Sequence, residues 1–116
     1  MVTVFGKELR KIRLDNDELL KDMATKLDIT AAYLSSIENG KKKPTAVFAN
    51  KICQEYSLSD DAARDLMDAY YRTVEEIAID AQNMTTKQFD MSLVLARKLN
   101  ELDSDQIDSI LKILNK

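Results

Sequence analysis

An all-α fold is predicted by the scarcity of turn-forming residues and by apolar residues spaced as on helices. The 116 residues contain only two glycines and one proline, too few for the many turns of a β-sandwich. Hydrophobic residues make up 45% and charged residues 32%, a composition typical of a folded globular chain. The length suffices for one compact domain, alone or with a short accessory segment.

Four short helices are expected within residues 1–58. Their apolar stripes have the three- and four-residue spacing of one helix face and cover Phe5–Ile12, Leu20–Leu27, Tyr33–Ile37 and Phe48–Tyr56. Thr3 and Thr30 stand where they cap the first and third helices. Gly40 suits a left-handed end to the third helix, and Pro44 precedes the fourth.

Further helices are expected within residues 59–116. Ser59 followed by Asp60 and Asp61 favours a helix start, because the hydroxyl caps the helix and the carboxylates complement its dipole. Apolar residues then recur at heptad spacing from Ala63 to Ala81. Two more stripes follow, Phe89–Leu99 and Ile107–Leu114, and Ser104-Asp105 is expected to cap the last helix. The predicted domain boundary therefore lies between residues 58 and 59.

Residues 20–37 have the arrangement of a helix-turn-helix unit. Such a unit needs a small residue where its helices touch, a tight turn, and a second helix whose outer face is free. Ala24 is that small residue, and Leu27-Asp28-Ile29 supplies the turn. The apolar residues that hold the pair together are Met23, Leu27, Ile29, Leu34 and Ile37. The stretch from Phe5 to about Leu58 resembles the Xre/Cro-like, or lambda-repressor-like, family of helix-turn-helix DNA-binding domains.

The resemblance implies a lambda-repressor-like domain over residues 1–58, followed by a helical extension, residues 59–116, for oligomerisation or partner binding. Arg13 and Glu38 stand where this family commonly keeps an ion pair that ties the first helix to the end of the recognition helix. The run Ile37–Lys41 resembles the family's exit from that helix. We therefore interpret Arg13 and Glu38 as a structural clamp.

The same resemblance assigns the DNA contacts. The recognition helix, residues 30–38, is expected to enter the major groove with Ala31, Ala32, Ser35 and Ser36 facing the bases. The expected contacts to the DNA backbone are Thr30, Tyr33, Lys21, Lys41, Lys42 and Lys43. A run of three lysines is by itself most often only solvated, but after this motif we interpret it as phosphate-binding. Because none of the base-facing residues makes a bidentate base contact, dimerisation and DNA shape must supply the remaining specificity.

The stripe from Ala63 to Ala81 allows two interpretations. It forms either a dimer interface, with Met67, Tyr70, Val74 and Ile77 as candidates, or an intramolecular seam against the last two helices. We favour the dimer, because helix-turn-helix proteins usually bind two half-sites one helical turn apart. Residues 1–58 carry a net charge of +2 and residues 59–116 one of −5, so the acidic half is expected to face away from DNA or toward a protein partner.

The leading prediction is a cytoplasmic, sequence-specific transcriptional regulator, namely a dimeric repressor that binds double-stranded DNA. The alternative is an antitoxin-type protein that binds a toxin through its C-terminal half and represses its own operon. No catalytic residue, metal or cofactor is expected, because the chain has no histidine, one cysteine and no glycine-rich phosphate loop. The absence of a long apolar run predicts no membrane segment.

Overall fold

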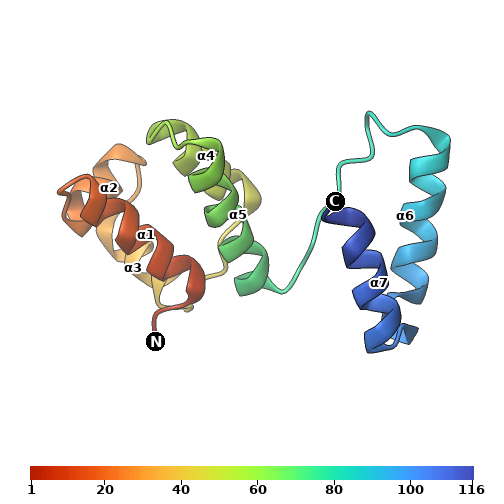
Figure 1. Cartoon of the computed structure of the whole chain (residues 1–116). Coiled ribbons are helices and arrows are strands. Elements are labelled where there is room, and N and C mark those ends of the chain that lie inside the picture. Colours follow the sequence, from red (N-terminus) through yellow and green to blue (C-terminus); the bar gives the residue numbers. More distant parts are fainter. The chain divides into compact units, whose positions relative to one another are not determined.

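The computed structural model describes residues 1–116 and contains seven α-helices, one short 3₁₀-helix and no strand (Figure 1). The predicted all-α class is confirmed. The elements are α1 Val4–Asp15, α2 Leu20–Lys26, α3 Ala31–Glu38, α4 Ala46–Glu55, α5 Asp60–Val74, α6 Thr86–Lys98, the 3₁₀-helix Leu99–Glu101 and α7 Ser104–Leu114. They form two compact units, Met1–Ile77 and Ala78–Lys116. None of the helices combines the length and the apolar composition needed to cross a membrane.

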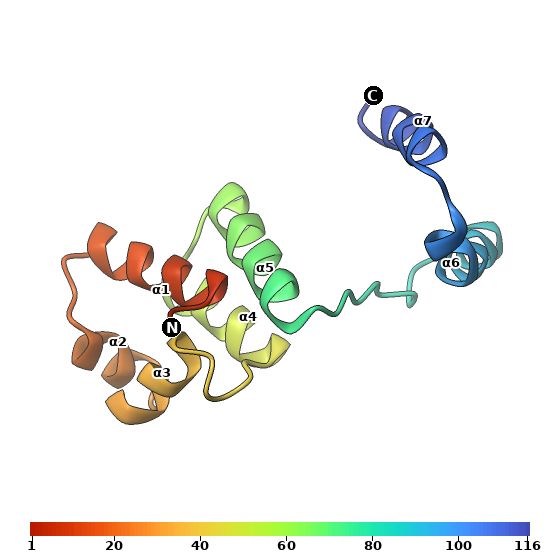
Figure 2. The same cartoon turned by 90° about the horizontal axis from the view of Figure 1, so that it is seen from below.

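Helices α1 to α5 enclose the hydrophobic core of the first unit. Its largest fully buried apolar side chains are Phe5, Leu9, Met23, Leu27, Leu34, Ile37, Ile52 and Leu66. The Phe5 ring lies at the centre, with ring centroids 6.3 Å from Phe48 of α4 and 6.2 Å from Tyr70 of α5. Cys53 lies half-buried beside this core, and burial raises the pKa of its thiol. One aromatic cluster thus joins α1, α4 and α5, which lie near one another in Figure 2.

Helix α5 belongs to the first unit, so the predicted boundary after residue 58 differs from the observed division after Ile77. Leu66, Tyr70 and Val74 are buried in the core formed with α1 and α4. The backbone N–H of Phe5 also donates a hydrogen bond to Thr73 Oγ1 at 3.0 Å. The sequence change at Ser59 therefore marks the start of a helix rather than the end of a domain.

This packing corrects the prediction that residues 63–81 form a dimer interface. Tyr70 and Val74 are buried within the unit, and Met67 packs half-buried against the same core, so these three residues do not form a free dimer surface. Helix α5 ends at Val74, where Glu75 adopts a left-handed φ of 57°, and Ile77 lies exposed beyond the helix. The stripe does pack within the chain, against α1 and α4 of the same unit.

Most of the expected helix ends are found where the sequence places them. Thr3, Thr30 and Ser59 each accept a hydrogen bond from a backbone N–H in the first turn of their helix, and Gly40 has a φ of +77°. The cap of α7 is Asp103, one residue before the expected Ser104. Its carboxylate accepts from the Gln106 N–H at 2.8 Å, and the Gln106 side chain accepts in return from the Asp103 N–H at 3.0 Å.

A close approach between α1 and the end of α3 depends on Gly6. This glycine is buried, and a Cβ atom added to it would lie 2.3 Å from the carbonyl oxygen of Glu38. The contact atom is backbone, which cannot rotate away as the end of a flexible side chain can. Only glycine allows α1 to cross the end of α3 at this distance.

We expect Gly6→Ala to destabilise the first unit. The steric cost of overpacking, about 1–3 kcal/mol, exceeds the roughly 1 kcal/mol that alanine gains in helix propensity. Urea denaturation followed by circular dichroism measures the difference. The control is Lys11→Ala, an exposed position of the same helix, which we expect to leave the midpoint unchanged. A Gly6→Ala variant as stable as the wild type would refute the close approach.

Candidate nucleic-acid interface

Helices α2 and α3 form a helix-turn-helix whose turn is held by backbone geometry. Ala24 is buried where the two helices meet, and Asp28 adopts a left-handed φ of 59°. The Ile29 N–H donates to the Ala24 carbonyl at 2.9 Å, which closes the turn. From α4, the Lys51 ammonium donates to the Leu27 carbonyl at 2.6 Å. Lys51 was not expected from the sequence, because nothing in its local pattern connects it to a turn 24 residues earlier.

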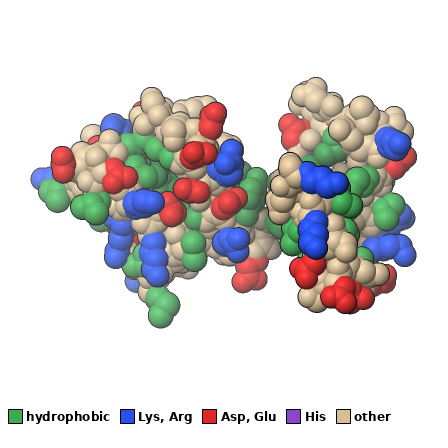
Figure 3. Space-filling model, in the orientation of Figure 1, with side chains coloured by type: hydrophobic (Ala, Val, Ile, Leu, Met, Phe, Trp, Pro, Cys, Tyr) green, Lys and Arg blue, Asp and Glu red, His purple; other side chains and the backbone are tan.

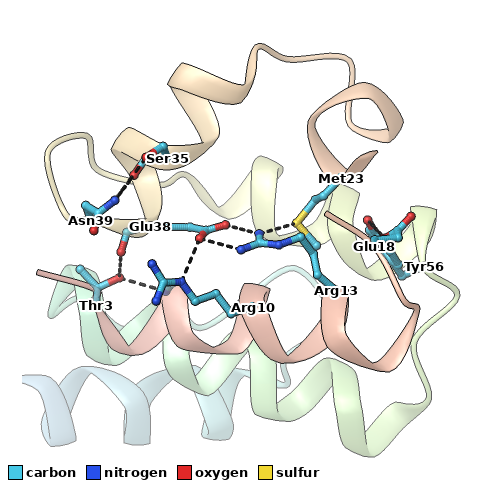
Figure 4. A network of polar contacts seen from close by, with 10 residues as sticks. Thr3, Arg10, Arg13, Glu18, Met23, Ser35, Glu38, Asn39 and Tyr56 are labelled. Atoms are coloured by element: carbon cyan, nitrogen blue, oxygen red, sulfur yellow. Dashed lines mark hydrogen bonds and ion pairs between the residues drawn. The ribbon is translucent and has the colours of Figure 1, made fainter. Parts of the chain in front are cut away.

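A buried ion pair fixes the C-terminal end of α3 against α1 (Figure 4). Arg13 donates through Nη1 to Glu38 Oε2 and through Nη2 to Glu38 Oε1, the latter at 3.0 Å. Arg13 is 8% exposed and Glu38 is 2% exposed. The Met23 sulfur accepts from Arg13 Nη1 at 3.4 Å, and Arg10 Nε lies 3.5 Å from Glu38 Oε1. The structure thus brings together the two residues predicted to form a clamp and adds a second arginine, Arg10, that no sequence pattern indicates.

The backbone at the end of α3 is fixed in the same region. The Thr3 N–H donates to the Glu38 carbonyl at 2.9 Å. The N–H groups of Lys41 and Lys42 both donate to the Ser36 carbonyl, at 2.9 and 3.1 Å. The loop of Lys41, Lys42 and Lys43 therefore leaves α3 in a defined direction, because its first two residues are hydrogen-bonded to that helix.

A second polar cluster holds the start of α2 against the end of α4. Figure 4 shows Tyr56 beside Glu18, and the Tyr56 hydroxyl donates to Glu18 Oε1 at 2.7 Å. Lys26 Nζ lies 3.4 Å from Glu18 Oε2. Lys26 Nζ also lies 4.3 Å from the Tyr56 ring centroid. Burial, together with the hydrogen bond to Glu18, raises the pKa of the Tyr56 hydroxyl, so it remains a donor across the neutral range.

The outer face of α3 is accessible. Leu34 and Ile37 are buried and hold the helix to the core, whereas Thr30, Ala32 and Tyr33 are exposed. Of the other positions expected to face bases, Ala31, Ser35 and Ser36 are half-buried. Apart from Tyr33, the face carries only small side chains, so a DNA duplex can approach the helix backbone closely.

The two serine hydroxyls differ in the hydrogen bonds they have left. Ser36 Oγ donates to the Ala32 carbonyl at 3.0 Å, so it retains only acceptor capacity. Ser35 Oγ accepts from Asn39 Nδ2 at 3.3 Å and keeps its own proton for donation. Each hydroxyl thus offers a base one hydrogen bond, and the two offer opposite polarity.

The lysines of the loop are exposed and differ in their neighbours. Lys42 Nζ lies 5.6 Å from the ring centroid of Tyr33, which places one cation beside α3. Lys43 Nζ lies 3.6 Å from Glu76 Oε1 in an exposed pair. Lys41 and, on α2, Lys21 are exposed. Figure 3 shows Lys and Arg side chains of this unit gathered at its lower left.

We expect Glu38→Gln to lower the free energy of unfolding by about 3–5 kcal/mol, because it leaves the buried Arg13 guanidinium without a counter-charge. Thermal unfolding followed by circular dichroism is the measurement. The matched control is Glu76→Gln, the same substitution in the exposed pair with Lys43, which we expect to be neutral. Equal melting temperatures for the two variants would contradict the assigned role of the buried pair.

The comparisons with known proteins agree with this geometry. The model of a protein family described as helix-turn-helix matches residues 7–61. The control protein C.MunI of a Mycoplasma species is 39% identical over 49 residues, which make up 41% of this chain and 66% of that protein, slightly less than two thirds. No solved structure matches. Residues 7–61 of this chain therefore match the helix-turn-helix family, and the N-terminal unit resembles the lambda-repressor-like DNA-binding domains.

Proposed function

We propose that this chain is a transcriptional regulator that binds an operator as a dimer and represses transcription. The observation that carries the proposal is the accessible outer face of α3, held by a buried clamp and followed at once by three exposed lysines. The similarity to a protein named a control protein supports a regulatory role. The family of the first unit supports DNA binding and speaks against an enzyme.

In the proposed complex, α3 lies in the major groove with its small residues against the bases. Ala31 and Ala32 suit contact with thymine methyl groups, while Ser35 donates and Ser36 accepts one bond each. Lys41 and Lys42 lie where they neutralise phosphates beside the groove. Affinity therefore comes mainly from phosphate contacts, and its salt dependence follows from counterion release.

Two copies are needed because one α3 reads few base atoms. A good bidentate contact discriminates by about 1–3 kcal/mol, and this helix has no side chain capable of one. Two helices on half-sites one helical turn apart double the number of base contacts and add a spacing requirement. Sequence-dependent DNA shape supplies the rest of the proposed specificity.

The antitoxin-type alternative has less support. One argument for it is the acidic second half of the chain. Residues 59–77 contain two Lys/Arg and six Asp/Glu, whereas residues 78–116 contain five Lys/Arg and six Asp/Glu. Most of the excess acidity thus belongs to α5 and the residues after it in the DNA-binding unit. The C-terminal unit is nearly neutral, so charge gives no reason for it to attract a basic toxin.

We expect Lys41→Ala/Lys42→Ala to weaken DNA binding at every sequence alike and to flatten the salt dependence. Each lost phosphate contact lowers the slope of log K against log salt by about 1. Fluorescence anisotropy with DNA from upstream of the chain's own gene measures this between about 50 and 200 mM salt. Lys11→Ala, which removes an exposed lysine from α1, serves as the control. An unchanged slope in the double variant would show that the loop does not touch DNA.

We expect Ala32→Glu to abolish operator binding while leaving the fold intact. The side chain is exposed on the outer face of α3, so a carboxylate there meets the negative potential of the groove without disturbing the core. Gln54→Glu adds the same charge at an exposed position of α4 and is expected to bind normally. An electrophoretic mobility shift measures DNA binding, and the melting temperature shows whether the fold is intact. A fully active Ala32→Glu variant would exclude α3 as the recognition helix.

A further inference from the structure

The C-terminal unit has large apolar side chains and no core to place them in. Neither α6 nor α7 contains a single buried residue. On α6, Phe89 is 44% and Leu93 is 48% exposed, and on α7 Leu111 is 47% exposed. Helices of this length depend on a packed apolar face for their stability, because their intrinsic propensity is insufficient. The unit also lacks cysteine and histidine, so neither a disulfide nor a zinc site replaces a core.

Helix α6 is apolar on more than one side. Phe89, Leu93 and Ala96 recur at intervals of four and three and so share one face. Val94 and Met91 lie on other sides of the helix, since each residue turns the helix by about 100°, and both are exposed. A helix that is apolar over several faces is typical of the interior of a bundle, yet in this unit only α7 is present to pack on it. We therefore expect α6 to be covered by a further helix.

The charges beside this face identify the covering helix. If Phe89 and Leu93 occupy positions d and a of a heptad, Asp90 and Arg97 both occupy position e. Two antiparallel copies of α6 bring the e positions of the two helices together, so Asp90 of each copy meets Arg97 of the other. In a parallel pair the two e positions are far apart, and this complementarity is lost. Residues 78–116 contain five Lys/Arg and six Asp/Glu. The unit is therefore nearly neutral, and two copies do not repel each other through their net charge.

We propose that a second copy of this chain covers the face of α6 formed by Phe89, Leu93 and Ala96, with the two α6 helices antiparallel and Asp90 paired with Arg97 across the interface. The α6 and α7 helices of the two copies then form one four-helix core. This inference deepens the proposed function by naming the surface that supplies its dimer. It is tested without DNA, so a failure of self-association and a failure of operator binding are distinguishable.

The first test compares two neighbouring apolar residues in the full chain by sedimentation equilibrium. Leu93→Lys, at the proposed seam, is expected to raise the dimer dissociation constant more than about tenfold, or 1.4 kcal/mol. Val94→Lys, the same charge at a position 44% exposed and off the seam, is expected to leave it unchanged. A wild-type chain that stays monomeric at tens of micromolar would overturn the proposal. Equal effects of the two variants would overturn this seam.

The second test uses surface charges, which do not disturb the apolar residues. Asp90→Lys and Arg97→Glu are each expected to weaken self-association about three- to tenfold, because like charges then meet across the interface. The double variant Asp90→Lys/Arg97→Glu restores both cross-pairs with reversed sign and is expected to dimerise like the wild type. Additive weakening in the double variant would exclude the antiparallel arrangement. A dimer that none of these changes affects would place the contact elsewhere.

Discussion

The buried pair between Arg13 and Glu38 is the constraint on which the proposed DNA-binding surface depends. Glu38 is the last residue of α3, and its carboxylate, its carbonyl and its Cα all contact α1 or the residues just before it. The carboxylate is held by arginine, the carbonyl accepts from Thr3, and Gly6 leaves room for the backbone. The angle of α3 and the exit of the lysine loop are therefore set together, at one buried point where a single unpaired charge would be costly.

This rigid support suits a recognition helix with little chemistry of its own. Ala31 and Ala32 offer only methyl contacts, and the hydroxyls of Ser35 and Ser36 are each partly used within the helix. Small side chains permit a close approach to DNA but discriminate weakly between bases. Position then matters more than side-chain identity, since weak contacts discriminate only when their geometry is fixed. In the proposed function, a defined spacing between two half-sites supplies sequence discrimination that a single α3 helix lacks.

Local features were predicted from the sequence, and contacts between distant segments were not. Caps such as Thr3, Thr30 and Gly40 follow from a few neighbouring residues and were found as expected. Two contacts join segments that are 24 or more residues apart, namely the hydrogen bond from Lys51 to Leu27 and the close approach at Gly6. No local sequence pattern predicts either of them. Arg13 and Glu38 were paired only through a family resemblance, because periodicity alone does not say which two charges meet inside a core.

The stripes on α5 and α6 show the limit of periodicity as evidence for an interface. Both have heptad-like spacing, but Tyr70 and Val74 of α5 are buried by α1 and α4, whereas Phe89 and Leu93 of α6 remain half-exposed. Spacing indicates that a helix has an apolar face, and only packing reveals what covers it. A face left open in a unit without a core makes the stability of that unit depend on protein concentration if a second copy covers it. In the proposed dimer, the DNA-binding unit folds around its own core, while the α6–α7 unit couples folding to the pairing that operator recognition requires.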